Sequence, residues 1–242
     1  MVYLKSFFFN SLFYVGTGIL VIVMGPVLLF PSGCARALAR FWGYMTYLLL
    51  GMIGITQNVS GDRQLNRQVL YAVKHQSAWE TIILCWLLAA PAFVLKRELL
   101  WLPIIGWFFL KIGCISVDRS AGMRALREMR AAGQDLAKKG RSILIFPQGT
   151  RVAPGAEQPY EIGVFSLYEA TGLPVVPVAL NSGHVWPRNS WLKYPGSVTV
   201  EFLDPIEPGL DRKRFMATLK QRIEDRMLVL DAIFMNDQTE AI

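Results

Sequence analysis

Short runs of β-prone residues alternate with longer segments of helical pattern from about residue 68 onward. This alternation constrains the fold most strongly, because strands connected by helices form a mainly parallel or mixed sheet with helices packed against it. We therefore expect an α/β domain over residues 61–242, with a frayed tail after Asp231. The expected strands are 69–73, 92–95, 114–117, 142–146, 175–180 and 197–203, and the expected helices are 78–90, 98–111, 121–139, 161–171 and 211–230.

Residues 1–60 are organised differently. Residues 7–30 carry no charged side chain, and a helix of that length measures roughly 36 Å, enough to cross the hydrocarbon core of a bilayer. Residues 41–55 form a second apolar stretch, but a helix of about 15 residues measures roughly 22 Å and is short for a full crossing. Basic residues lie both between and outside the two stretches and favour no single topology. We expect a membrane-associated helical hairpin that dips into the bilayer.

Two processing signals compete with this interpretation of the N-terminus. A secretory signal peptide has a shorter apolar core and a more basic start than the single Lys5 provides. Lipoprotein processing at Cys34 is disfavoured because Pro31, rather than an aliphatic residue, lies three positions before it. We therefore expect the hairpin to stay in the protein.

The overall composition favours contact with lipid. Hydrophobic residues make up 53% of the chain and charged residues only 18%, against a usual charged fraction of about 25%. The net charge of +7 favours an anionic partner such as lipid headgroups or an acidic protein. No arginine-rich run interleaved with aromatic residues occurs, so we expect no nucleic-acid partner.

The cysteines and histidines do not suggest a metal site. Cys34, Cys85 and Cys114 are an odd number without C-x-x-C spacing, and the two histidines lie far apart. We expect reduced thiols and no metal.

The segment KHQSAWE, residues 74–80, follows an expected strand and precedes an expected helix. Ser77 and Glu80 match the S-x-x-E capping box, in which the carboxylate binds backbone N–H groups at the helix start. Alternatively, Glu80 orients the imidazole of His75, which then acts as a general base. A carboxylate has two oxygens, so the two interpretations do not exclude each other, and the residues alone leave both open.

Two further segments contain residues suited to binding an anion. In ILIFPQGTRVAPG, residues 143–155, Gly149 allows close approach of the backbone, Thr150 offers a hydroxyl and Arg151 can bind a phosphate with two hydrogen bonds. A solvated surface turn is the alternative. Residues 95–120 contain an apolar middle followed by basic residues, and a plain core helix with a surface ion pair is the alternative there.

Taken in order, KHQSAWE, LPIIGWFFLKIGCISVDR, FPQGTR and LPVVPVAL resemble the four sequence blocks of the glycerolipid acyltransferase family. The resemblance covers about residues 70–183 and is strongest to the bacterial 1-acylglycerol-3-phosphate acyltransferases. The preceding pair of apolar segments and the chain length are also similar to that family.

The resemblance implies roles for individual residues. The H-x-x-x-x-D motif of the family falls on His75 and Glu80, which implies that His75 is the base and Glu80 its orienting acid, with glutamate in place of aspartate. The basic residues of the second block fall on Lys111 and Arg119. Pro177 matches the proline of the fourth block.

The third block implies an acceptor site. The FPEGTR motif of the family falls on residues 146–151, so Arg151 is expected to bind the acceptor phosphate, with Gly149 and Thr150 beside it. Gln148 replaces the usual glutamate and is expected to contact the glycerol part of the acceptor. The loss of that charge leaves acceptor specificity open.

The implied reaction transfers a fatty acyl group from an acyl thioester, acyl-ACP or acyl-CoA, to the sn-2 hydroxyl of 1-acylglycerol 3-phosphate, giving phosphatidic acid. No cofactor beyond the thioester co-substrate is implied, and the apolar residues 99–110 are expected to line an acyl groove or form plain core. The expected location is a bacterial inner membrane, with the catalytic domain on the cytoplasmic face. Another lysolipid acceptor, such as lyso-ornithine lipid, and a non-catalytic membrane-bound lipid-binding protein are the alternatives. A serine hydrolase is disfavoured because no G-x-S-x-G occurs.

Overall fold

A seven-stranded mixed sheet forms the centre of the molecule. The computed structural model describes the backbone of residues 1–240 and the side chains of residues 1–236. The strand order is β1-β7-β6-β2-β5-β3-β4, and neighbouring strands are parallel except for the antiparallel β6–β7 pair. The strands are β1 (Ile55–Ser60), β2 (Leu70–Val73), β3 (Ala92–Lys96), β4 (Ile115–Val117), β5 (Ile143–Ile145), β6 (Val175–Leu180) and β7 (Gly196–Phe202).

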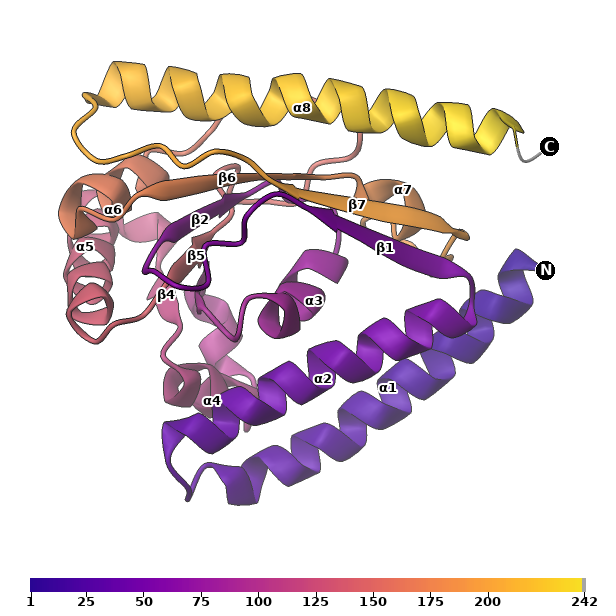
Figure 1. Ribbon diagram of the computed structural model, residues 1–242. Helices are drawn as coiled ribbons and strands as arrows, with labels where there is room; N and C mark the ends of the chain where they lie inside the picture. Colours follow the sequence, from indigo (N-terminus) through magenta and orange to yellow (C-terminus); the bar gives the residue numbers. More distant parts are fainter. Residues whose placement is uncertain (241–242) are drawn as a thin grey trace.

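Helices cover both faces of the sheet, as Figure 1 shows, with α8 on one face and α1, α2 and α3 on the other. The side chains of β2 alternate between these layers: Leu70 and Ala72 pack with α5, α6 and α8, whereas Tyr71 and Val73 pack with α1, α2 and α3. The helices are α1 (Val2–Val27), α2 (Ser32–Met52), α3 (Trp79–Leu87), α4 (Ile105–Ile112), α5 (Met123–Lys138), α6 (Gly163–Thr171), α7 (Ser182–Val185) and α8 (Arg212–Glu240), with short 3-10 helices η1 (Arg97–Trp101) and η2 (Arg119–Ala121).

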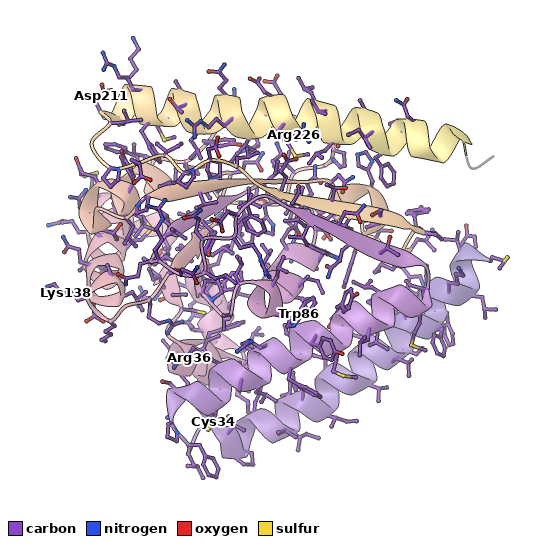
Figure 2. The ribbon with its side chains drawn as sticks, in the orientation of Figure 1. Cys34, Arg36, Trp86, Lys138, Asp211 and Arg226 are labelled. Atoms are coloured by element: carbon purple, nitrogen blue, oxygen red, sulfur yellow. The ribbon has the colours of Figure 1, made fainter. Side chains whose placement is uncertain are left out.

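The N-terminal helices α1 and α2 form an antiparallel pair that packs beneath the sheet (Figure 1). Within the described residues, α1 alone is long and apolar enough to cross a membrane. The helix α2 approaches α3 closely, because a Cβ atom at Gly43 would lie 2.7 Å from the carbonyl oxygen of Ile82. Tyr47 stacks on Trp86 with ring centroids 4.9 Å apart (Figure 2). The pair is therefore joined to the domain by tight packing rather than by a linker alone.

The C-terminal helix α8 lies along the opposite face of the sheet. Its residues Phe215, Leu219 and Ile223 are fully buried against the sheet. Arg226 on α8, labelled in Figure 2, pairs with Glu201 on β7. The α8 backbone continues to Glu240, so the expected fraying after Asp231 is wrong up to that residue, and residues 241–242 lie outside the described residues. Met227, Leu230 and Phe234 are buried at the spacing of three and four residues that is typical of a helix, and this pattern continues α8 past Asp231.

The expected α/β class with a mixed sheet is confirmed, and all six expected strands are present with ends shifted by at most one residue. The structure adds β1, which begins at Ile55, before the expected domain start at residue 61, and pairs with β7. Its mostly exposed polar residues give little strand signal. The expected helix over 98–111 is two helices, since Pro103 lacks an N–H donor and Ile104 has a φ of 64°.

Candidate active site

His75 lies in the turn between β2 and α3, at the carboxyl end of a strand in the middle of the sheet. This edge of an open α/β sheet is where ligands usually bind. The imidazole is 9% exposed and stacks on the ring of Phe146, with centroids 3.8 Å apart and planes inclined by 15°. Phe146 directly follows the neighbouring strand β5, so two adjacent strands fix the plane of the imidazole.

Glu80 is fully buried beneath this turn. Its Oε1 atom accepts hydrogen bonds from the backbone N–H of Gln76 at 2.7 Å and of Ser77 at 3.0 Å, and from the hydroxyl of Ser182 at 2.8 Å. Its Oε2 atom accepts from the Ser77 N–H at 3.0 Å. Burial raises the pKa of the Glu80 carboxyl to about 7, while the N–H and O–H donors act in the opposite direction.

The expected hydrogen bond between Glu80 and His75 is absent. The Nδ1 atom of His75 is buried without a hydrogen-bond partner among the side chains that the structure describes. The carboxylate of Glu80 is instead occupied by the backbone of the turn, as the capping-box interpretation expects. The Ser77 hydroxyl accepts from the N–H of Trp79 at 3.1 Å rather than from that of Glu80.

Two glutamine side chains also hold this turn. The Oε1 atom of Gln148 accepts from the backbone N–H of His75 at 3.3 Å, and the Oε1 atom of Gln76 accepts from that of Gly183 at 3.0 Å. The backbone N–H of Val152 donates to the carbonyl oxygen of His75 at 2.8 Å. Gln148 is 1% exposed, so it supports the turn from below rather than lining the open site.

A cavity of about 770 Å³ opens beside His75. Near the imidazole it is lined by Gly149 and Thr150 and by the guanidinium groups of Arg119, Arg151 and Arg188. Arg119 donates to the carbonyl oxygen of Gly149. Burial of the ring, together with the positive charges of these three arginines, lowers the pKa of His75 to about 3. The imidazole is therefore neutral at physiological pH.

Apolar side chains make up most of the remaining cavity wall. This wall is shared by the N-terminal pair, by β3 and by helices α4 and α5. The lining apolar residues include Leu20, Val21 and Met24 of α1, Trp42 of α2, Phe93 of β3, Phe108, Phe109 and Ile112 of α4, and Leu126 and Met129 of α5. Part of the expected groove segment 99–110 therefore lines the cavity, while Trp101, Trp107 and Leu110 are exposed on the outside.

Several sequence-predicted residues are brought together and others are not. His75, Gly149, Thr150, Arg151 and Arg119 share the cavity wall. Glu80 and Gln148 are buried behind His75 and hold its backbone. Lys111 lies in the last turn of α4 and is not among the residues that line the cavity.

Sequence reasoning missed three charged residues of the cavity wall, Lys96, Glu161 and Arg188. Lys96 ends β3, so its position at the carboxyl end of a strand is a signal that could have identified it. Arg188 lies in an irregular loop, and no local pattern marks it. The described residues contain no group of His, Cys, Asp and Glu that could hold a metal ion.

Comparisons with known proteins agree with this geometry. A family model described as Acyltransferase matches residues 56–181. The 1-acyl-sn-glycerol-3-phosphate acyltransferase of Pseudomonas aeruginosa is 34% identical over 208 residues, which cover 86% of this chain and 81% of that protein. The enzyme of the same name from Salmonella typhimurium is 27% identical, over 88% of this chain and 89% of that protein.

The fold is also that of a solved structure. The crystal structure of the 1-acyl-sn-glycerophosphate acyltransferase PlsC from Thermotoga maritima matches with a TM-score of 0.79 at 21% sequence identity, covering 96% of this chain and 98% of that chain. The family model spans more than half of the sequence, and the Pseudomonas aeruginosa relative is similar over most of its length. The chain therefore belongs to the acyltransferase family.

Proposed function

We propose that this protein transfers an acyl group from a thioester to the sn-2 hydroxyl of 1-acylglycerol 3-phosphate. The observation that carries the proposal is that one cavity is lined by His75, by the three arginines Arg119, Arg151 and Arg188, and by many apolar side chains. A phosphate suits the arginines and a fatty acyl chain suits the apolar side chains. The hydroxyl and the thioester carbonyl then meet beside the imidazole. The names of the relatives from Pseudomonas aeruginosa and Salmonella typhimurium support the same acceptor.

In the proposed reaction, the accessible Nε2 atom of His75 removes the proton from the acceptor hydroxyl while that oxygen attacks the thioester carbonyl carbon. The new C–O bond forms, the C–S bond breaks, and the leaving thiolate receives the proton from the imidazolium. Burial lowers the pKa of His75 most, and the charges of the three arginines lower it further. Bound phosphate offsets the part that is due to the arginines, so it makes the base stronger. Arg151 and Arg119 hold the phosphate and supply the positioning part of catalysis.

Glu80 has a different role in this mechanism from the one that the resemblance implies. It binds the backbone N–H groups of Gln76 and Ser77, and Gln148 binds the backbone N–H of His75. We assign both as positioning residues that hold the His75 turn. Phe146 holds the imidazole plane by stacking.

The proposal also covers the acyl donor, the membrane and the cellular location. The donor is an acyl carrier protein or CoA thioester, and no metal or other cofactor takes part. The membrane supplies the lipid acceptor, with the apolar surface of α1 and α2 lying against it. The catalytic domain faces the cytoplasm of a bacterial cell, where acyl thioesters are made.

The test is an acyl-transfer assay in detergent with the His75→Ala variant. The assay combines acyl-CoA and acyl carrier protein donors with 1-acylglycerol 3-phosphate, glycerol 3-phosphate and lyso-ornithine lipid. We expect transfer to 1-acylglycerol 3-phosphate to fall by about 10²- to 10⁴-fold in the variant, because general base catalysis contributes that much. Flotation with liposomes should be unchanged.

His184→Gln is the matched control, because His184 pairs with Asp231 at 2.8 Å and does not line the cavity. It should keep most of its activity. Near-normal turnover by His75→Ala would refute the mechanism. Preference for lyso-ornithine lipid would refute the acceptor assignment, since that lipid has no phosphate for the three arginines. Transfer to no acceptor by the wild-type protein would favour a lipid-binding role.

A further inference from the structure

The loop over residues 186–195 connects α7 to β7 and carries Arg188 into the cavity. Arg188 lies outside the four sequence blocks that resemble the glycerolipid acyltransferases. We propose that Arg188 is a third binding residue for the phosphate of the acceptor, together with Arg119 and Arg151. This inference rests on the proposed function and assigns to its acceptor site a residue that the sequence comparison does not mark.

The geometry places the Arg188 side chain beside Arg151. Its Nη1 atom donates to the backbone carbonyl oxygen of Arg151 at 2.8 Å, and both residues line the cavity with His75 and Arg119. The hydrogen bond uses one of the five N–H donors of the guanidinium group. The remaining donors form no hydrogen bond with the other described residues, so they can bind oxygens of a ligand.

Within the part of the chain whose side chains are described, no ion pair balances the charges of these arginines. Among the described residues, none of Arg119, Arg151 and Arg188 has a carboxylate within 4.0 Å. Glu161 lines the same cavity without forming an ion pair with them. A phosphate monoester carries about 1.5 to 2 negative charges at neutral pH. A dianionic group is therefore the ligand that three clustered guanidinium groups fit best.

Contacts with α1 fix the position of this loop. The side-chain amide of Asn10 donates to the carbonyl oxygen of Trp191 at 2.9 Å, and the hydroxyl of Ser6 accepts from the backbone N–H of Lys193 at 2.9 Å. Trp186 packs edge-on against the ring of Phe9 at a centroid distance of 5.3 Å. Ser6 and Asn10 are almost completely buried. The N-terminal helix therefore helps to position Arg188 from outside the cavity.

The phosphate of the acceptor is favoured over the phosphate groups of the donor. The hydrogen bond from Arg188 ends on the backbone of Arg151, the residue assigned to the acceptor phosphate. Both guanidinium groups also lie near enough to His75 to act on the charge state of the ring. An acceptor phosphate is linked to the attacking hydroxyl through the glycerol carbons, so it must lie close to this base.

The experiment measures steady-state kinetics of the full-length enzyme with Arg188→Ala and Arg188→Lys. We expect Arg188→Ala to raise the KM for 1-acylglycerol 3-phosphate by about 10- to 100-fold, with little change in kcat or in the KM for the donor, because a charge-assisted contact made in the ground state is lost. Arg188→Lys keeps the charge, so its KM for 1-acylglycerol 3-phosphate should lie between that of the wild-type enzyme and that of Arg188→Ala. Arg212→Ala is the matched control, since it removes an exposed positive charge at the start of α8, away from the cavity.

A second measurement separates this inference from the proposed function. Calorimetric titration of His75→Ala and of His75→Ala with Arg188→Ala compares 1-acylglycerol 3-phosphate with uncharged 1-acylglycerol. The assignment is supported if Arg188→Ala weakens the binding of 1-acylglycerol 3-phosphate more than the binding of 1-acylglycerol. This holds even if the wild-type protein transfers acyl groups to no acceptor. An unchanged acceptor KM, a change confined to the donor KM, or equal weakening for both lipids would overturn it.

Discussion

Glu80 and Glu224 are two carboxylates that hold the chain on either side of His75, from opposite faces of the sheet. Glu80, on α3, is fully buried and binds only N–H and O–H groups of uncharged residues. Glu224, on α8, binds the ammonium group of Lys74 with both oxygens at 2.8 Å and accepts from the Tyr160 hydroxyl at 2.8 Å. The side chain of Glu224 is 32% exposed, whereas that of Lys74 is 4% exposed.

The difference shows two ways of fixing the same turn. Glu80 binds backbone N–H groups and has no cationic partner among the described residues. Its charge therefore neutralises no buried cation. Glu224 neutralises a buried ammonium group next to His75 and connects the loop after β5, through Tyr160, to the C-terminal helix. Neither carboxylate forms a hydrogen bond with the imidazole. His75 is therefore positioned through its backbone and through stacking on Phe146, rather than by a hydrogen bond to an acid.

The largest effect is expected for Glu80→Ala. This change leaves the buried N–H groups of Gln76 and Ser77 and the hydroxyl of Ser182 without their acceptor, and each unsatisfied buried donor costs about 1–3 kcal/mol. We expect a loss of about 3–5 kcal/mol in the free energy of unfolding, together with a large loss of activity. Chemical denaturation in detergent and the acyl-transfer assay measure the two effects.

Glu80→Gln is the control that removes the charge of Glu80 and keeps a hydrogen-bond acceptor. All three donors reach the Oε1 atom of Glu80, so a glutamine oxygen at that position can accept from each of them. Only the second contact of the Ser77 N–H, to Oε2, is lost, because the glutamine Nε2 atom is a donor. We expect stability within about 1 kcal/mol of wild type and most of the activity retained. If Glu80→Gln is as inactive as Glu80→Ala while remaining folded, the negative charge acts on His75 and the backbone role is wrong.

The pH dependence of stability gives the next largest effect. The pKa of Glu80 is about 7 in the folded protein, against 4.5 for an ordinary glutamate. The folded state therefore binds the proton more tightly, and the free energy of unfolding falls as the pH rises from about 4.5 to about 7. The fall amounts to about 3 kcal/mol, since one pKa unit corresponds to about 1.4 kcal/mol.

His75 has the opposite effect, because its pKa is lowered to about 3 and its contribution to stability rises with pH up to the ordinary histidine value. The difference in unfolding free energy between wild type and Glu80→Gln removes this contribution, since both proteins contain His75. As the pH rises, the wild-type protein should lose stability relative to Glu80→Gln. A difference that does not vary between pH 4.5 and pH 7 would show that Glu80 is ionised throughout.

The local contacts of these two carboxylates can be predicted from the sequence, whereas their long-range contacts cannot. The contact between Glu80 and the Ser77 N–H is local, so the S-x-x-E pattern predicts it. The Ser182–Glu80 hydrogen bond joins residues 102 positions apart, and the Lys74–Glu224 contact joins residues 150 positions apart. No local pattern marks such pairs, because the sheet order that brings them together is a tertiary property.

The strands and the cavity residues also differ in how far the sequence predicts them. The buried strands carry apolar runs that identify them, whereas β1 is mostly exposed and its polar residues hide it. Gly149, Thr150 and Arg151 follow one such strand and were identified from their types. Arg188 reaches the same wall from a loop held by α1, and its contribution depends on contacts that only the folded chain shows.

Apart from the Glu80→Gln control, the smallest expected loss of stability is for Glu224→Ala. Removing this carboxylate leaves the Lys74 ammonium group buried without its partner, and breaking a fully buried ion pair costs about 3–5 kcal/mol. Because Glu224 is partly exposed, its removal lets water reach Lys74, and we expect a loss nearer to about 2 kcal/mol. The double variant Lys74→Met with Glu224→Met removes both charges and should be more stable than Glu224→Ala. If the double variant is instead less stable by chemical denaturation, the pair contributes packing or specificity beyond neutralising the lysine, and Glu224 resembles Glu80 in organising the turn.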